Sequence, residues 1–154
     1  IQTYLKVKLS IQDNLINPFI QAAQDEDLRC LIGNDLYFDM LSDQTGKYNE
    51  VLEGGSFTLN NKPYMHQGLK SVLASFSYGR FMGNGGIVPT NFGVVIKSNN
   101  NSTQVSSNQL ARIRQNHIDS AHSKFELVQL YMKEKGFIDC SPKKTGRRFR
   151  IRKV

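Results

Sequence analysis

The sequence lacks the features that mark a secreted or membrane-spanning protein. It has two cysteines, Cys30 and Cys140, and neither belongs to a CxxC motif or a Cys/His cluster. Free thiols in a reducing cytosol fit this pattern better than the alternative, a single disulfide that closes a very long loop. No apolar run approaches the roughly 20 residues that span a bilayer, and the first residues contain no signal-peptide core. We therefore expect a soluble protein that is made in a cytosol and has no membrane contact.

The sequence also lacks a recognisable arrangement of catalytic or metal-binding residues. Its three histidines are His66, His117 and His122, and the last two are five apart, which misses the i, i+4 spacing of helical metal ligands. We expect His117 at the edge of the core and His122 at the surface. The glycine-rich residues 83–86 follow a helix and lack the Gly-Lys-Ser/Thr ending of a phosphate-binding loop. We expect no catalytic residue, metal or cofactor, so an enzyme is the least favoured class.

One acidic run, Asp25-Glu26-Asp27, has two interpretations. Clustered carboxylates can bind a divalent cation. On a short amphipathic helix, however, such a run is usually a solvated face. We favour the solvated face.

Acidic residues are absent from the end of the chain, and this absence shapes the distribution of charge. The chain has 20 basic and 13 acidic residues, for a net charge of +7. Seven of the basic residues fall within 143–154, so residues 1–142 hold 13 basic and 13 acidic residues. A DNA-binding fold usually spreads positive charge over its body. This chain is instead a neutral body with a basic tail.

The basic tail alternates arginines with apolar residues in the run Arg148-Phe149-Arg150-Ile151-Arg152. As a strand it would carry its arginines on one face and its apolar side chains on the other. Docking on another protein is the favoured interpretation, and DNA contact or a solvated tail are the alternatives. The candidate contact residues of this C-terminal arm are Lys143, Lys144, Arg147, Arg148, Phe149, Arg150, Ile151, Arg152 and Lys153.

The apolar periodicity of the first half predicts an extended arm followed by helices. Residues 4–11 alternate between apolar and polar, which is typical of a strand or arm. A helix is predicted to begin at Asn17, as its cap, with Pro18 in the first turn, and to end at Gly33. Asn34 is predicted to cap a second, short helix.

The second half predicts two more helices separated by long loops. The third helix is expected over 65–82 and the longest over 107–135, capped by Ser106 or Ser107 and ended by Gly136. The apolar stripe of the longest helix comprises Leu110, Ile113, His117, Ala121, Phe125, Val128 and Met132. The long loops are 43–64 and 84–106, with a short strand or hairpin at 56–59 and a strand-like run at 92–97. The predicted fold class is mostly α, a helical bundle around a C-terminal spine helix, with long loops and extended N- and C-terminal arms.

The order of motifs resembles the head–tail connector proteins of tailed phages. The resemblance begins with the run from Asn17 to Asp25 and the residues Leu28, Leu31, Gly33, Leu36, Tyr37 and Leu41. It continues through Leu52-Glu53-Gly54-Gly55, Gly68-Leu69-Lys70, Tyr78-Gly79-Arg80-Phe81, the run from Thr90 to Lys97, and Ser106-Ser107-Asn108-Gln109-Leu110. These later motifs are most similar to the version found in crAss-like phages of the Bacteroidetes group. The resemblance covers roughly residues 12–135, so the segment after Gly136 depends on the physical argument alone.

The resemblance implies a helical adaptor fold without catalysis. It implies a homo-oligomeric ring of twelve subunits in the virion neck, which binds the portal protein above and a neck or tail protein below. Such a ring lines the DNA exit channel and contacts packaged DNA transiently, and its subunits are made in the host bacterial cytoplasm. We expect residues 1–136 to form the connector domain and 137–154 the basic arm. The alternative function is a nucleic-acid-binding module that acts through the basic tail.

Overall fold

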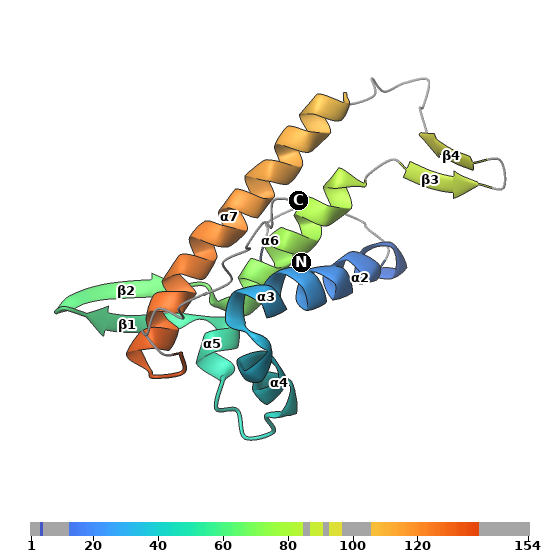
Figure 1. Ribbon diagram of the computed structural model, residues 1–154. Coiled ribbons are helices and arrows are strands. Elements are labelled where there is room, and N and C mark those ends of the chain that lie inside the picture. Colours follow the sequence, from blue (N-terminus) through green and yellow to red (C-terminus); the bar gives the residue numbers. More distant parts are fainter. Residues whose placement is uncertain (1–3, 5–12, 85–86, 91–92, 97–105, 139–154) are drawn as a thin grey trace, which may run out of the picture.

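The computed structural model describes Tyr4 and residues 13–84, 87–90, 93–96 and 106–138, and most of these residues are helical. In chain order the elements are α2 (Asp13–Ala22), η1 (Ala23–Leu28), α3 (Arg29–Ile32), α4 (Asn34–Ser42), α5 (Asn49–Glu53), β1 (Gly55–Leu59), β2 (Lys62–His66), α6 (Gly68–Gly83), β3 (Ile87–Thr90), β4 (Gly93–Ile96) and α7 (Ser107–Glu134) (Figure 1). The predicted mostly helical fold class with a long C-terminal helix is confirmed. Apart from Tyr4, which is helical rather than extended, the predicted N-terminal arm lies outside the described residues. None of the described helices is long and apolar enough to cross a membrane.

The long helix α7 packs along α6, and the two helices form the centre of the molecule (Figure 1). Small residues of α6 lie at this contact, since the buried Ser75 accepts a hydrogen bond from Lys124 of α7 at 2.8 Å. A Cβ atom added at Gly79 would lie 3.3 Å from the Cβ of His117, which is tighter than ordinary contact. A Cβ at Gly83 would lie 2.8 Å from the Cδ of Arg114. The glycines therefore set the spacing between the helices on this side.

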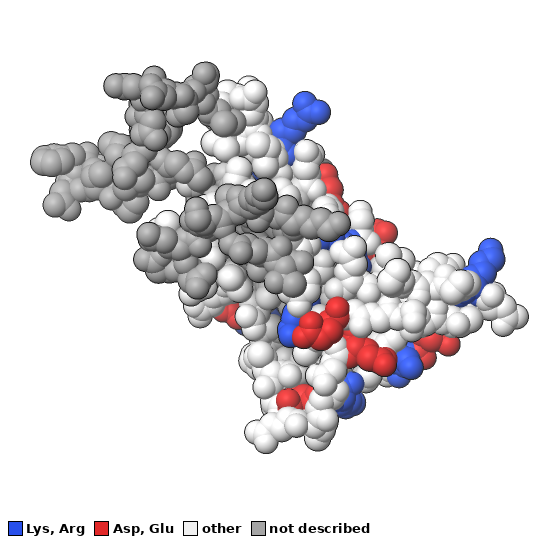
Figure 2. Space-filling model, turned by 180° about the vertical axis from the view of Figure 1, so that it is seen from behind, with Lys and Arg blue, Asp and Glu red and all other residues white. Residues whose placement is uncertain are grey.

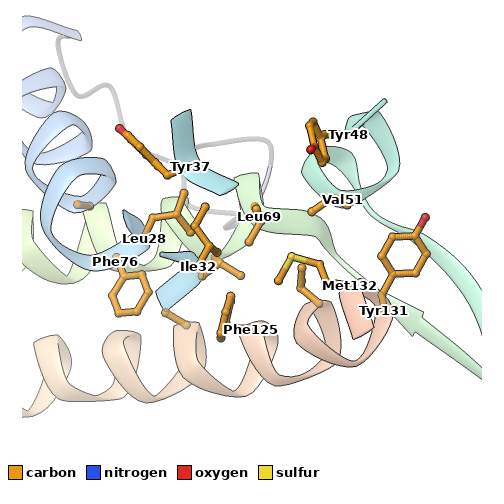
Figure 3. Packing of buried hydrophobic residues seen from close by; sticks show 14 of the residues in the cluster. Leu28, Ile32, Tyr37, Tyr48, Val51, Leu69, Phe76, Phe125, Tyr131 and Met132 are labelled. Atoms are coloured by element: carbon orange, nitrogen blue, oxygen red, sulfur yellow. The ribbon is translucent and has the colours of Figure 1, made fainter. Parts of the chain in front are cut away.

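One hydrophobic core joins the two long helices to the N-terminal helices and the first hairpin. Figure 3 shows Phe125 and Met132 of α7 pointing toward Ile32 and Leu69. The predicted stripe of α7 is confirmed in its C-terminal part, where Ala121, Phe125, Val128 and Met132 are all buried. Its first three members, Leu110, Ile113 and His117, are only partly buried. Tyr131 is also buried and was not part of the predicted stripe.

The ends of α7 follow the predicted signals. The Ser106 side chain accepts a hydrogen bond from the backbone N–H of Gln109, and the Gln109 side chain accepts one from the backbone N–H of Ser106. This reciprocal pair is a capping box, which satisfies backbone donors that a helix start leaves free. Gly136 adopts a left-handed conformation with φ of 72°, which ends the helix as expected. Of the two proposed caps, Ser106 is therefore the one used.

The predicted start of the first helix was wrong. The helix α2 begins at Asp13, and Pro18 lies inside it instead of in its first turn. Ile16, which precedes the proline, is buried, and α2 packs along α6. Burial of a large apolar side chain is worth about 1.5–3 kcal/mol. We infer that this burial stabilises the helical turn before Pro18. It compensates for the backbone hydrogen bond that proline, which has no N–H group, cannot donate.

A short π-helical segment, η1, follows α2 without a break and leads into α3. Gly33 then ends α3 with φ of 84°, as predicted, and the short helix α4 follows. The predicted cap at Asn34 was wrong, because Asn34 is the first helical residue and Gly33 precedes it with no side-chain cap. The sharp corner therefore depends on the left-handed conformation of glycine.

The segment 43–64 is folded, which corrects the prediction of a long loop. It contains α5, all of β1 and part of β2, and the two strands pair antiparallel from Gly55 with His66 to Leu59 with Lys62. Asn60 and Asn61 form the turn with φ of 50° and 60°, which matches the left-handed residues of a two-residue hairpin turn. The hairpin expected at 56–59 is thus confirmed, with a longer extent.

A second hairpin lies within the other expected loop, 84–106. The predicted strand-like run 92–97 contains β4, which pairs antiparallel with β3. In Figure 1 the two hairpins extend away from the helices at opposite ends of α7. Residues 97–105, which complete this expected loop, lie outside the described residues.

Phe125 provides a test of the core. Replacing Phe125 with Ala should destabilise the subunit by about 3–5 kcal/mol, because it leaves a cavity between α7 and the N-terminal helices. Leu127, which is 36% exposed on the same helix, is the matched control, and Leu127→Ala should cost less than about 1 kcal/mol. Urea denaturation followed by circular dichroism measures both. Equal losses for the two variants would contradict the assignment of Phe125 to the core.

Candidate interaction surfaces

The predicted contact residues of the C-terminal arm, Lys143 to Lys153, all lie outside the described residues, as does Cys140. The structure therefore leaves the predicted site untested. The other cysteine, Cys30, is an exposed free thiol. Phe137 and Ile138, where the described chain ends, pack against the core.

The acidic run joins elements of the fold, which corrects the prediction that it is only a solvated face. Arg80 of α6 donates two hydrogen bonds to Asp27, from Nε to Oδ2 at 2.6 Å and from Nη2 to Oδ1 at 2.9 Å. The Nη2 of Arg80 also lies 2.7 Å from Glu26 Oε2. Asp25 accepts a hydrogen bond from the Tyr37 hydroxyl at 2.9 Å. The three carboxylates therefore fasten η1 to α6 on one side and to α4 on the other.

The ion pairs of Arg80 hold its side chain charged and in place. The hydrogen bonds that Arg80 donates to Asp27 and Glu26 raise the pKa of Arg80 well above its usual range. The side chains of Arg80 and Asp27 are each 26% exposed, so solvent screens their pair only in part. A guanidinium that bonds one carboxylate through two nitrogens also fixes the relative orientation of the two groups.

A cleft of about 240 Å³ opens beside this ion pair. Residues of η1, α3, α6 and α7 line it: Glu26, Asp27, Cys30, Leu31, Phe76, Arg80, Arg114, Ile118 and His122. The two acids are bonded to Arg80, so the cleft offers no unpaired carboxylate to a cation. Within the described part of the chain, no group of three His, Cys, Asp or Glu residues could hold a metal ion.

The predicted positions of the two histidines on α7 are confirmed. His117 is half-buried at the edge of the core, with its ring edge-on to Tyr78 at 4.7 Å, and burial lowers its pKa. His122 is exposed, and its ring lies edge-on to Phe76 at 5.3 Å.

Arg80 provides a test of the ion pair. Arg80→Met keeps the apolar stem and should destabilise the protein by about 1.5–3 kcal/mol, because it removes charged hydrogen bonds from the largely buried Asp27. Lys70→Met is the matched control, since it breaks an exposed ion pair with Glu53, for which a loss under about 1 kcal/mol is expected. Urea denaturation of both variants measures the difference. If Arg80→Met proves no more costly than Lys70→Met, the pair does not fasten η1 to α6.

A buried histidine whose role the sequence did not indicate lies at the base of the first hairpin. His66 is 2% exposed, and neither of its ring nitrogens has a hydrogen-bond partner among the described residues. Its ring lies 4.4 Å from the ring of Tyr131. The Tyr131 hydroxyl donates to Glu50, and burial together with this bond raises the pKa of Tyr131 to about 12. Burial lowers the pKa of His66, while the nearby Glu50 opposes this effect.

His66 should make stability depend on pH. An unfolded histidine titrates near pH 6.5, whereas the pKa of folded His66 is lower. As pH falls below about 6.5, the unfolded chain binds a proton that the folded protein does not, so stability is present above that pH and is lost below it. His66→Phe should reduce the loss of unfolding free energy between pH 7.5 and pH 5, measured by urea denaturation. The variant should still lose some unfolding free energy over this pH range, because the pKa of His117 is also lowered. An unchanged slope in His66→Phe would refute the assignment.

Large apolar side chains are exposed on several outer elements. Met65 on the first hairpin is 73% exposed, and Leu15 on α2 is 55% exposed. On α4, Phe38 is 56% and Leu41 is 58% exposed, and Leu127 on α7 is 36% exposed. These side chains belong to four different elements instead of one pocket. Single exposed apolar residues are ordinary on a monomer, but their spread gives the protein several surfaces on which another chain can pack.

Residues 28–147 match the family described as a family of unknown function, DUF6712, so the chain belongs to that family. No curated protein and no solved structure shows a significant match to the chain.

Proposed function

We propose that this member of the DUF6712 family is a structural virion protein of a tailed-phage neck. In this proposal it forms a ring that joins the portal to the tail and lines the DNA exit channel. The ring contains twelve copies, binds the portal protein on one side and a neck or tail protein on the other, and contacts packaged DNA transiently. The subunit is made in the host bacterial cytoplasm and acts in the virion, without catalysis.

The resemblance to head–tail connectors supports the proposal over most of the described chain. Its motifs fall on elements that build the body: Gly33 at the corner between α3 and α4, Arg80 in the ion pair with η1, and Ser106 at the cap of α7. Gly79, in the same motif as Arg80, lies where α6 approaches α7. The residues that carry the resemblance are therefore ones on which the fold itself depends.

The observation that carries the proposal is the exposure of apolar side chains on four outer elements. A ring subunit contacts one neighbour through one surface and the other neighbour through a different surface. Met65 on the projecting hairpin and Phe38 on α4 belong to such separate surfaces. The strands of the hairpin also have outer edges, to which a neighbouring extended segment can add by backbone hydrogen bonding.

A nucleic-acid-binding module that acts through the basic arm is the second candidate. The observation that favours it is the concentration of seven positive charges in residues 143–154 with no acid among them. If the arm were the main nucleic-acid contact, its affinity would fall steeply as salt rises, and neutralising the arm would flatten that slope.

Particle composition tests the proposed function. In virions of the phage that encodes the chain, reconstruction should place its density in a ring between portal and tail. Phe149→Ser with Ile151→Ser should weaken incorporation into particles although it removes no charge, because the apolar side chains contribute to protein docking. The matched variants replace Arg148, Arg150 and Arg152 with Gln, which removes the charges and keeps the apolar side chains.

Two results would count against the neck assignment. Absence of the chain from the neck in purified virions would overturn it. Normal incorporation of the Phe149→Ser, Ile151→Ser variant, combined with failure of the glutamine series and a steep salt dependence of DNA binding, would favour the nucleic-acid module.

A further inference from the structure

The outer face of α4 combines exposed acids with exposed apolar side chains. Asp35, Phe38, Asp39 and Ser42 follow the i, i+3, i+4, i+7 spacing that places residues on one helix face, and all four are exposed. Leu41, at the margin of this face, is 58% exposed. Among the described residues, Asp35 has no side-chain hydrogen bond or ion pair. We call this set the α4 face.

The α4 face lies in the most acidic part of the chain. Residues 25–53 contain eight acidic residues and two basic ones, Arg29 and Lys47. Arg80 and Lys70 of α6 pair with three of those acids and reduce the excess without cancelling it. Figure 2 shows acidic side chains gathered over the lower part of the molecule, with fewer basic ones among them. This region is therefore suited to a cationic partner.

The described chain ends beside these acids. The ring of Phe137 lies 5.2 Å from the ring of Tyr48, and the Tyr48 hydroxyl donates a hydrogen bond to Asp39 at the edge of the α4 face. Asp43, in the turn after α4, accepts hydrogen bonds from Thr45 that lower the pKa of its carboxyl group, so it is charged at neutral pH. Phe137 thus lies near Asp39 and Asp43, which both accept hydrogen bonds from Tyr48.

The length and chemistry of the C-terminal segment match the face. Lys143 lies six residues beyond Phe137, and six extended residues span roughly 20 Å. The segment 143–154 has seven basic residues and no acid, and it includes Phe149 and Ile151. Its charges complement Asp35, Asp39 and Asp43, although Asp39 also forms an exposed ion pair with Lys47 at 3.7 Å. Its apolar residues complement Phe38 and Leu41.

We propose that the α4 face and the turn after it bind the chain's own basic segment 143–154 in the free subunit. The chain's own segment is favoured over that of a second copy because a short tether gives it an effective concentration on the order of millimolar. The inference concerns the free subunit and does not depend on the proposed role in the neck. A partner of the arm then has to compete with the α4 face, which shields the seven charges from unspecific binding to polyanions.

Carbodiimide cross-linking of the full-length chain tests the proposal, because it joins a lysine amine to a carboxylate in direct contact. An equal mixture of ¹⁵N-labelled and unlabelled chains is cross-linked and digested, and linked peptides are identified by mass spectrometry. We expect Lys143, Lys144 or Lys153 to be joined to Asp35, Asp39 or Asp43, with both peptides carrying the same isotope. Glu126, exposed on α7, is the internal control and should form few links to the arm.

A matched pair of charge reversals sharpens the test. Asp35→Lys should lower the yield of links at Asp39 and Asp43 about threefold to tenfold, because repulsion replaces attraction at an exposed pair. Glu126→Lys makes the same change of charge on α7 and should leave that yield unchanged. Phe149→Ser with Ile151→Ser should also lower the yield, since docking uses the apolar face. Unchanged thermal melting of each variant verifies that the fold is intact.

Four results would overturn the proposal. Links of the arm spread evenly over Glu126 and the acids of the α4 face would show no specific docking, as would their absence. Linked peptides of mixed isotope would show that the arm of a second copy occupies the face. An equal loss of links in Asp35→Lys and Glu126→Lys would show that only net charge matters.

Discussion

The close packing of α6 against α7 is the constraint on which the rest of the structure depends. Small residues of α6 let the long helix approach, and a Cβ atom at Gly79 would lie 3.3 Å from His117, closer than ordinary contact. The approach brings Phe125 and Met132 into one core with Leu69 and Ile32. Since the N-terminal helices pack against α6 and the first hairpin against α7, a wider spacing would loosen both attachments. The outer surfaces, including the α4 face, are positioned by this pair of helices.

Arg80 extends that constraint to the N-terminal helices. It is carried by α6, and it holds two consecutive carboxylates of η1 while Asp25 turns toward Tyr37 of α4. The three adjacent acids therefore bond to two elements, α6 and α4. These bonds hold the short helices α3 and α4 in place beside the core. This attachment is polar and partly solvated, so it supplies orientation, while the buried apolar residues supply most of the stability.

The sequence predicts the helical body well because its signals are local. The apolar stripe of α7, the cap at Ser106 and the glycines at 33 and 136 each act within a few residues, and the structure confirms them. The start of α2 was mispredicted because burial of Ile16 outweighs a local proline signal. The partnership of Arg80 with Asp27 joins residues 53 apart in the chain, and the burial of His66 depends on α7, so neither follows from local pattern. The sequence indicated a charged C-terminal arm, and only the fold shows that the described chain ends near acids.

The π-helical segment η1 has a consequence for the length of related chains. Its turn holds more residues than an α-helical turn, so it accommodates an insertion within one continuous helix. In an α-helix each residue adds about 100° of rotation. A relative that lacks one residue between Ala23 and Leu28 would regain regular α-helix, with α2 and α3 in nearly the same relative orientation. The same loss from a regular α-helix would instead turn Ile16 and Phe19 away from α6.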